Sequence, residues 1–243
     1  MVVVIVLGLS FLGYVATRRL GPERGIMITA LCGALVSSTA VTANYARRLR
    51  QGDGPEGALI AGIALASLVM FVRVQVLTTV LVPHAGRSLA IAMVPAFVVG
   101  AVTTLLAVRN RDATSGASEI SLGNPMDFRP ALLLAGLVAI MAVIARWSLA
   151  RFGDQGIAVV LGITGMMDVD AAVLTLANMP RTGIDGHLAG LVLAIPVLTN
   201  TLLKAGLALM LAGPSRKGWK AAAPLTGSVV ASVIGIGLAG TFG

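Results

Sequence analysis

The sequence predicts an all-α integral membrane protein of about eight transmembrane helices, arranged as two four-helix repeats with broken helices at the midplane. Three observations predict this class. Apolar residues make up 57% of the 243 residues and charged residues only 12%, whereas a soluble domain carries about 25% charged residues. The mean hydropathy is +0.94. The apolar runs are also long and continuous, without the alternation that a membrane β-barrel strand needs.

The apolar runs set the expected membrane spans. A run of roughly 20 apolar residues crosses the hydrocarbon layer as a helix, and clusters of Gly, Pro and charged residues mark the breaks. The expected breaks include Arg47–Glu56, Pro83–Gly86 and Ala212–Trp219. Eight spans are therefore expected, at residues 2–17, 25–46, 57–82, 87–108, 129–151, 156–179, 187–211 and 220–241. The first is expected to be a retained helix rather than a cleaved signal peptide, because no basic residue precedes its apolar run.

The most polar break, residues 109–128, divides the chain into two halves, residues 1–108 and 129–243, of four spans each. At an offset of 131 residues, GIMITALCGALVSSTAVTANYA in the first half lies over GIAVVLGITGMMDVDAAVLTLA in the second. Ser37 and Thr39 then fall opposite Asp168 and Asp170. This placement of polar residues indicates an internal repeat. An even number of spans per half makes the repeat parallel, unless one segment is re-entrant.

The distribution of basic residues does not orient eight spans in the membrane. Cytoplasmic loops usually carry the excess of Lys and Arg. With eight crossings, one face collects eight basic residues: Arg18, Arg19, Arg24, Arg87, Arg151, Arg216, Lys217 and Lys220. The other face collects seven: Arg47, Arg48, Arg50, Arg109, Arg111, Arg129 and Arg181.

Two carboxylates lie inside a predicted span. Eight of the ten acidic residues fall in the breaks, and the other two are Asp168 and Asp170. Asp168 follows Gly156 by twelve residues, or about 18 Å along a helix, and an ionised carboxylate at that depth costs roughly 2.5–3.5 kcal/mol. The pair therefore indicates an ion or proton path. The alternative is that both carboxylates pair with buried cations and only fix helix packing.

The spacing of these two residues favours an interrupted helix. In a regular helix, residues i and i+2 point about 200° apart, whereas in an extended segment they point the same way. Gly162 and Gly165 precede the Asp pair, as Gly33 precedes Ser37, and Gly weakens a helix. We therefore expect the second span of each half to be unwound at this point and the two segments to face each other, as broken helices do in many transporters.

Other polar residues are expected around the carboxylates, with two interpretations for several of them. Asn200 can offer an oxygen to a cation or join helices through a hydrogen bond, and the two Met residues are core filling or soft metal ligands. Arg73 and Lys204 lie deep in their spans, and their natural partners are the two Asp residues. The expected metal ligands are Asp168, Asp170, Ser37, Ser38, Thr39 and Asn200, and the expected path or gate contains Arg73, Lys204, Met166, Met167, Thr42, Asn44 and Asn178.

Several functional classes are excluded by what the sequence lacks. The single Cys32 cannot form an intrachain disulfide, and the composition does not fit a nucleic-acid-binding domain despite the net charge of +8. No His–Glu–x–x–His zinc motif, phosphate-binding loop or nucleophile elbow occurs, and His84 and His187 fall at breaks. We expect no enzyme activity, no cofactor and no nucleotide.

A family resemblance is carried by the stretches LGLSFLGYVATRRLGPERGIMITALCGALVSSTAVTANYARR, NPMDFRPALLLAGL, FGDQGIAVVLGITGMMDVDAAVLTLA and LTNTLLKAG. The chain resembles the membrane domain found at the C-terminus of many bacterial MgtC/SapB-type proteins, a family of unknown function numbered 4010. Its paired signatures fall on Ser37–Thr39 and on Asp168–Asp170, and its Asn–x–x–x–Lys pattern falls on Asn200 and Lys204. Because the MgtC partner domain is associated with magnesium physiology, the resemblance implies handling of divalent cations.

The expected function is that of a divalent metal ion transporter or uniporter in the bacterial inner membrane, with the metal ion as substrate and a homodimer as its assembly. Hard oxygen ligands suit Mg²⁺, Mn²⁺ or Ca²⁺. One alternative is a transporter of a small anionic or zwitterionic solute that Arg73 and Lys204 anchor. The other is a non-transporting membrane scaffold or regulatory subunit, in which the polar residues only lock helices together.

Overall fold

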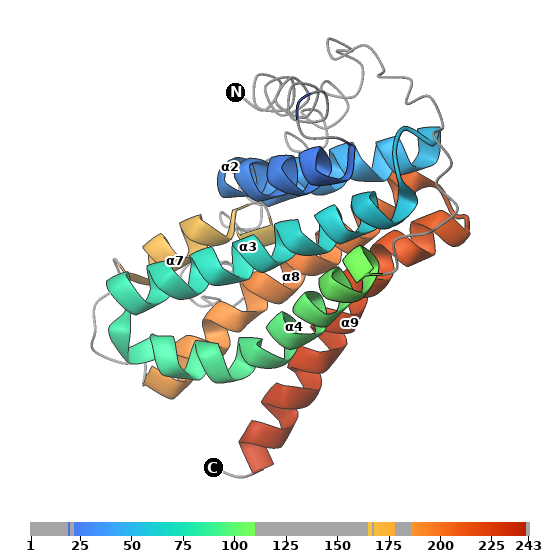
Figure 1. The fold of residues 1–243 in the computed structure, drawn as a ribbon. Coiled ribbons are helices and arrows are strands. Elements are labelled where there is room, and N and C mark those ends of the chain that lie inside the picture. The colour runs from blue at the N-terminus through green and yellow to red at the C-terminus, as the bar shows by residue number, and fades with distance from the viewer. Residues whose placement is uncertain (1–18, 20–21, 110–164, 167, 178–185, 242–243) are drawn as a thin grey trace, which may run out of the picture. The chain divides into compact units, whose positions relative to one another are not determined.

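The structure, a computed structural model, describes residues 19, 22–109, 165, 166, 168–177 and 186–241. Within these residues every element is a helix and no strand occurs, which confirms the predicted all-α class (Figure 1). The helices are α2 (Pro22–Gln51), α3 (Glu56–Leu81), α4 (Pro83–Arg109), α7 (Val169–Ala177), α8 (Gly186–Ala212) and α9 (Arg216–Thr241).

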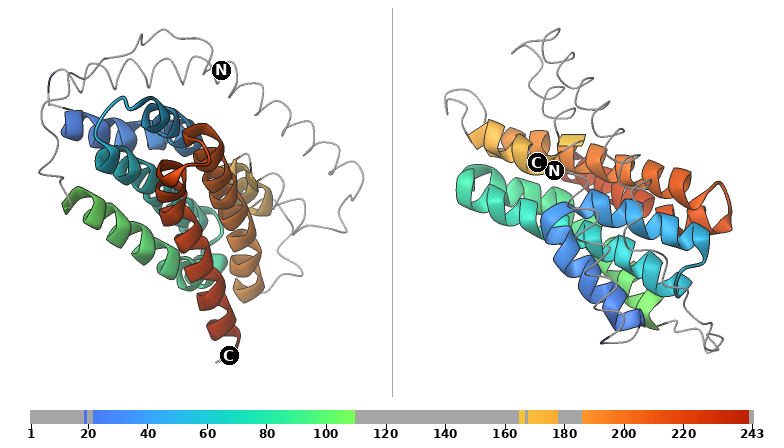
Figure 2. Two further views of the ribbon diagram at one scale, coloured as in Figure 1. Left: turned by 90° about the vertical axis from the view of Figure 1, so that its right-hand side faces the viewer. Right: turned by 90° about the horizontal axis from the view of Figure 1, so that it is seen from above.

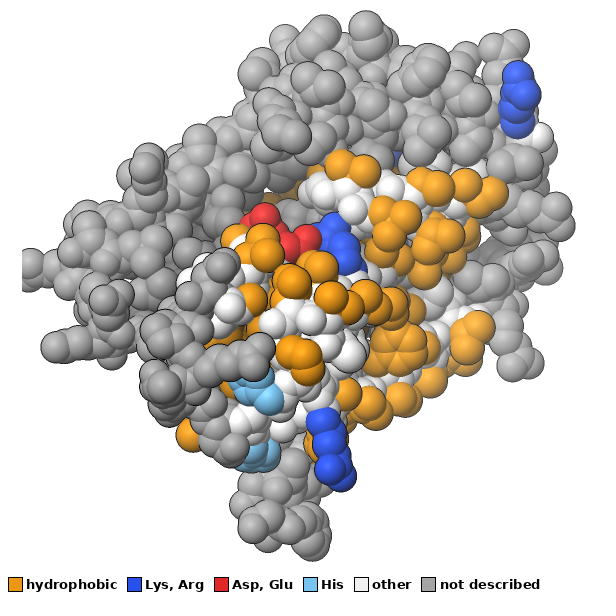
Figure 3. Space-filling model, turned by 90° about the vertical axis from the view of Figure 1, so that its left-hand side faces the viewer, with side chains coloured by type: hydrophobic (Ala, Val, Ile, Leu, Met, Phe, Trp, Pro, Cys, Tyr) orange, Lys and Arg blue, Asp and Glu red, His pale blue; other side chains and the backbone are white. Residues whose placement is uncertain are grey.

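Five of these helices are long and apolar enough to cross a membrane: Gly25–Gln51, Glu56–Leu81, Pro83–Leu106, Gly186–Ala212 and Arg216–Gly237. Many of their large apolar side chains are exposed, as lipid contact requires, and Figure 3 shows hydrophobic side chains covering much of the described part of one face. The chain thus has the helices of a membrane protein. The predicted spans 2–17 and 129–151 lie outside the described residues, so the number eight and the two four-helix repeats stay predictions.

Three expected breaks are shorter than the sequence suggested. The break expected at Ala212–Trp219 shrinks to residues 213–215, because α8 ends at Ala212 and α9 begins at Arg216. The expected break Pro83–Gly86 is wrong, because α4 begins at Pro83 and only Val82 separates it from α3. Proline suits the first position of a helix, where its missing N–H is not needed. The break expected at Arg47–Glu56 shrinks to residues 52–55, because α2 continues to Gln51. Gly52 ends α2 with a φ of 72°, the left-handed conformation of a helix C-cap that glycine adopts without penalty.

Helix α2 is folded back on itself at Ser37. Ser37 has φ −157° and ψ 101°, an extended conformation inside the helix. The Tyr45 hydroxyl donates a hydrogen bond of 2.6 Å to the Ile26 carbonyl. In a straight helix these two residues would be about 28 Å apart, far beyond the reach of a tyrosine side chain. The second arm of α2 therefore turns back toward the beginning of the first, and Figure 2 shows the two blue arms meeting at a sharp bend.

The chain divides into two compact units. The first comprises Met1–Met70, Val99–Gly136 and Lys204–Leu225, and the second comprises Phe71–Val98, Leu137–Leu203 and Thr226–Gly243. The helices α3, α4, α8 and α9 each contribute residues to both units, whereas α2 belongs only to the first and α7 only to the second.

The first unit is built where α3 packs against both arms of α2. A Cβ at Gly62 of α3 would collide with the Tyr45 ring and would touch Ala30 on the other arm. Tyr45 is 2% exposed, and Ile26 and Leu59 are also buried in the core of this unit. The absence of a side chain at Gly62 therefore allows α3 to approach the folded α2 closely.

The second unit is held by close contacts between α4, α8 and α9. A Cβ at Gly190 of α8 would meet Ser88 and the backbone of α4, and a Cβ at Gly235 of α9 would meet Pro95 of α4. The Ser228 hydroxyl of α9 also donates to the Ala96 carbonyl at 3.2 Å. Small residues at helix contacts are typical of membrane proteins, because they let helix backbones approach.

We predict opposite effects for two Gly→Ala substitutions in membrane helices. Gly62→Ala should lower the thermal stability of the detergent-solubilised protein, because the new Cβ collides with the Tyr45 ring, and overpacking of this kind costs about 1–3 kcal/mol. Gly206→Ala is the matched control, since nothing lies within 4 Å of its Cβ and Ala is the better helix former. Equal melting temperatures for the two variants would show that α3 does not depend on this contact.

Candidate functional site

The candidate site is centred on the start of α7, where the helix is interrupted as the sequence predicts. Gly165 and Met166 are helical, Asp168 is not, and α7 begins at Val169. The Asp168 Oδ1 accepts a hydrogen bond of 3.0 Å from the Asp170 backbone N–H. Asp168 is thus the N-cap of α7, a position at which a side-chain oxygen satisfies an N–H of the first turn.

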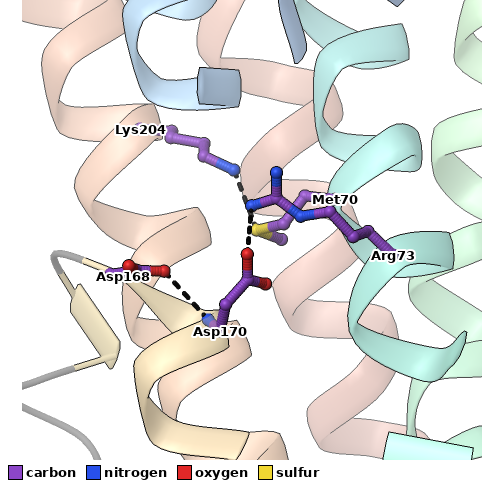
Figure 4. A network of polar contacts seen from close by, with 5 residues as sticks. All are labelled: Met70, Arg73, Asp168, Asp170 and Lys204. Atoms are coloured by element: carbon purple, nitrogen blue, oxygen red, sulfur yellow. Dashed lines mark hydrogen bonds and ion pairs between the residues drawn. The ribbon is translucent and has the colours of Figure 1, made fainter. Parts of the chain in front are cut away.

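Asp170 points toward Arg73 of α3 (Figure 4). Its Oδ2 lies 2.9 Å from Arg73 Nη2, and both side chains are about one quarter exposed, at 26% and 27%. The pairing predicted between Arg73 and an intramembrane Asp is therefore present. Among the described residues, no hydrogen-bond donor reaches the buried Oδ1 of Asp170. One carboxylate oxygen is neutralised by Arg73, and the other is an acceptor in a water-poor setting.

Asn200 of α8 fixes the segment that precedes the break. Its Nδ2 donates to the Met166 carbonyl at 2.9 Å, and one turn earlier on α8 Pro196 packs so closely on Gly165 that a Cβ there would collide with it. The bond through Nδ2 sets the orientation of the amide, so that Oδ1 points away from Met166. Asn200 is 3% exposed, and no donor from the described part of the chain reaches its Oδ1.

These contacts define what we call the α7 site: Arg73, the Met166 carbonyl, Asp168, Asp170 and Asn200, all in the second unit. It presents carboxylate, amide and carbonyl oxygens beside one guanidinium group. Across the described residues no cluster of three or more His, Cys, Asp or Glu side chains occurs. A cation at this site would therefore need amide or backbone oxygens as well as the two carboxylates, a mixed set that Ca²⁺ and similar hard cations accept.

Lys204 belongs to the first unit. It is fully buried, at 0% exposure, and its Nζ lies 2.9 Å from the Met70 Sδ (Figure 4). The sequence does not distinguish Met70 as a functional residue, because methionine is one of many apolar residues in this helix. Lys204 was expected to be deep in its span, and its burial agrees with that expectation.

The remaining predicted residues of the first half lie on α2. The Ser37 Oγ accepts a hydrogen bond of 3.2 Å from the Ala40 N–H, and the Thr42 hydroxyl donates to the Ser38 carbonyl at 3.0 Å. Ser38 and Thr42 are buried, whereas Thr39 and Asn44 are half-buried. Ser37 is therefore the N-cap of the second arm of α2. Met167 and Asn178, the last two predicted residues, lie outside the described residues.

The two interrupted helices share one local design. At the offset of 131 residues, Ser37 falls opposite Asp168. Each of the two is non-helical, and each caps the helix that starts at the next residue. The equivalence was inferred from polar residue placement alone, and the two caps now add a structural match at the aligned position.

Gln75, a polar residue two positions after Arg73, has a structural role. Its Nε2 donates to the Gly86 carbonyl at 2.9 Å and to the Thr79 hydroxyl at 3.2 Å. It thereby ties the end of α3 to the first turn of α4.

We predict that the capping role of Asp168 can be separated from its charge. Asp168→Ala should destabilise the protein by about 0.5–2 kcal/mol, because the Asp170 N–H loses its acceptor. Asp168→Asn should leave stability nearly unchanged, since Asn caps a helix as well as Asp does. Chemical denaturation in detergent measures both, and an equal loss in the two variants would contradict the capping role.

Comparison with known proteins gives the family. Residues 4–212 match the domain described as a domain of unknown function, DUF4010. A protein of Aquifex aeolicus (strain VF5), described only as an uncharacterized protein, is 31% identical over 193 residues, which cover 76% of this chain and 81% of the relative. No solved structure matches the chain. The matched region contains both interrupted helices and the whole α7 site, and the chain belongs to the DUF4010 family.

Proposed function

We propose that the protein transports divalent metal ions across the bacterial inner membrane, as a uniporter with the α7 site as its ion site. The observation that carries the proposal is the pair of buried acceptors at an interrupted helix, Asp170 Oδ1 and Asn200 Oδ1, which no donor in the described part of the chain satisfies. A buried acceptor without a partner costs about 1–3 kcal/mol, and a cation that takes both oxygens as ligands removes that cost.

The chemistry of the site supports a hard cation. Carboxylate, amide and backbone carbonyl oxygens are the ligands of Mg²⁺, Ca²⁺ and Mn²⁺. The membrane helices, together with a relative from the bacterium Aquifex aeolicus, support a location in the bacterial inner membrane. The expected contribution of Ser37, Ser38 and Thr39, the homodimer and the association with MgtC-type partners stay predictions.

Arg73 fits this function as an internal substitute for the metal ion. Arg73 forms an ion pair with Asp170 in this structure. Without that partner the Asp170 carboxylate would be an unpaired charge in a low-dielectric region, which costs several kcal/mol. A uniporter must return through its cycle with an empty site. In the proposal, Arg73 binds Asp170 during that return and leaves it when the metal ion binds.

The first test is metal flux into liposomes that contain the purified full-length protein and a metal-sensitive dye. We expect Asp170→Asn to reduce Mn²⁺ or Ca²⁺ flux about tenfold or more, because a charged ligand is lost and each factor of ten needs only about 1.4 kcal/mol. Asp168→Asn, which keeps the cap, should also reduce flux. The control is Glu56→Gln, which removes the exposed ion pair of Glu56 with Lys220 and should leave flux unchanged. Wild-type flux in both Asp variants would exclude this ion site.

The second test separates net flux from exchange. We expect Arg73→Ala to reduce net uptake about tenfold, since the empty site then carries an unpaired carboxylate, but to keep metal-for-metal exchange within about twofold of wild type. Arg73→Lys retains the charge and should retain net uptake, and Lys220→Gln serves as the control for the loss of a surface cation. Parallel loss of net uptake and exchange in Arg73→Ala would contradict the role of Arg73.

One observation favours a second candidate function, the transport of a small anionic or zwitterionic solute. Arg73 lies beside the first turn of α7, and both a guanidinium group and a helix N-terminus attract anions. Flux of such a solute that survives Asp170→Asn but is lost in Arg73→Ala would favour this candidate over the metal ion.

A further inference from the structure

We infer that the chain crosses the membrane six times, that α2 and the segment around α7 are re-entrant hairpins, and that the face at which α2 enters and leaves is the cytoplasmic one. This inference does not depend on the proposed transport function. It replaces the eight crossings that hydropathy alone suggests.

Each arm of α2 is too short to cross the hydrocarbon layer by itself. Residues 22–36 and 38–51 form helices of about 22 and 21 Å at 1.5 Å per residue, and each is shorter than the roughly 30 Å of the hydrocarbon layer. The hydrogen bond from Tyr45 to Ile26 joins the middle of the second arm to the beginning of the first. A segment folded in this way returns to the face from which it came, although its summed hydropathy equals that of a span.

The ends of the helices are distributed between the two units in a regular way. Both ends of α2 fall in the first unit, together with the start of α3, the end of α4, the end of α8 and the start of α9. The second unit holds the other ends of those four helices and the whole of α7. Four helices are thus divided between the two units, whereas α2 and α7 each lie within one unit. Helix α7, with nine residues, is also only about 13 Å long.

The second half of the chain contains a segment that corresponds to the α2 hairpin. The α7 segment aligns with α2 at the offset of 131 residues, and both have an N-capped break at the aligned position. With one hairpin in each half, three crossings remain per half. An odd number reverses the orientation of the second half, so the repeat is inverted rather than parallel.

With six crossings, most of the basic residues fall on the same face of the membrane. Three basic residues between the spans or near their ends then lie on one face: Arg87, Arg151 and Arg181. The other face receives twelve: Arg18, Arg19, Arg24, Arg47, Arg48, Arg50, Arg109, Arg111, Arg129, Arg216, Lys217 and Lys220. With eight crossings, the two faces carried eight and seven basic residues. An excess of this size identifies the cytoplasmic face, where anionic lipid head groups attract Lys and Arg.

Single-cysteine labelling in intact bacterial cells tests the inference. In a Cys32→Ser background, which removes the one native thiol, a membrane-impermeant maleimide is applied before and after permeabilisation. The labelled positions are all exposed in the structure: Arg19→Cys, Gln51→Cys, Ser215→Cys, His84→Cys and His187→Cys. We expect the two His variants to react in intact cells, and the other three to react only after permeabilisation.

Any other labelling pattern contradicts a specific part of the proposed membrane topology. Arg19→Cys and Gln51→Cys flank α2, so their labelling from opposite faces would exclude the α2 hairpin. Gln51→Cys and Ser215→Cys on opposite faces would exclude six crossings, because eight crossings require that result. The reverse sidedness of all five positions would overturn the cytoplasmic orientation. Because the assay measures no flux, its outcome is separate from that of the transport experiments.

Discussion

The backbone of an interrupted membrane helix must find hydrogen-bond partners without water, and this constraint shapes the rest of the structure. Each new helix start exposes N–H groups that have no partner within the helix, and lipid supplies none. Ser37 and Asp168 each supply a side-chain oxygen to the first turn that follows. The residue types at both breaks are therefore those of N-caps, and the Asp168 carboxylate is held at the α7 site by its capping bond.

Helix α8 provides the rigid support for this arrangement. Pro196, Asn200 and Lys204 are spaced four residues apart, so they follow one face of the helix. Pro196 packs on Gly165, and Asn200 binds the Met166 carbonyl. The same two contacts hold the chain on the N-terminal side of the break, while the Asp168 cap and the Arg73 ion pair hold the other side. A substitution in α8 can thus alter the α7 site without touching either carboxylate.

Hydropathy and breaker residues predicted the elements closely where each apolar run is one helix. The spans expected at 57–82 and 187–211 match α3 and α8 to within one residue at each end. The break near Asp168 was also predicted, because two carboxylates after Gly165 do not suit a continuous helix. The fold-back of α2 could not be predicted in this way, because the hydropathy of the apolar run is the same whether its two arms form one straight helix or a hairpin. The contact of Lys204 with Met70, separated by 134 residues, likewise leaves no mark on local sequence.

Two of the four carboxylate oxygens of Asp168 and Asp170 already have a partner within the protein. Asp168 Oδ1 accepts the capping bond, and Asp170 Oδ2 faces Arg73. A ligand can therefore reach Asp168 through its other oxygen while the cap persists, but it can take both oxygens of Asp170 only when Arg73 withdraws. Asn200 Oδ1 is held in place by its own Nδ2 bond and needs no such exchange. The geometry thus makes Asp170, rather than Asp168, the residue at which ligand binding competes with an internal charge.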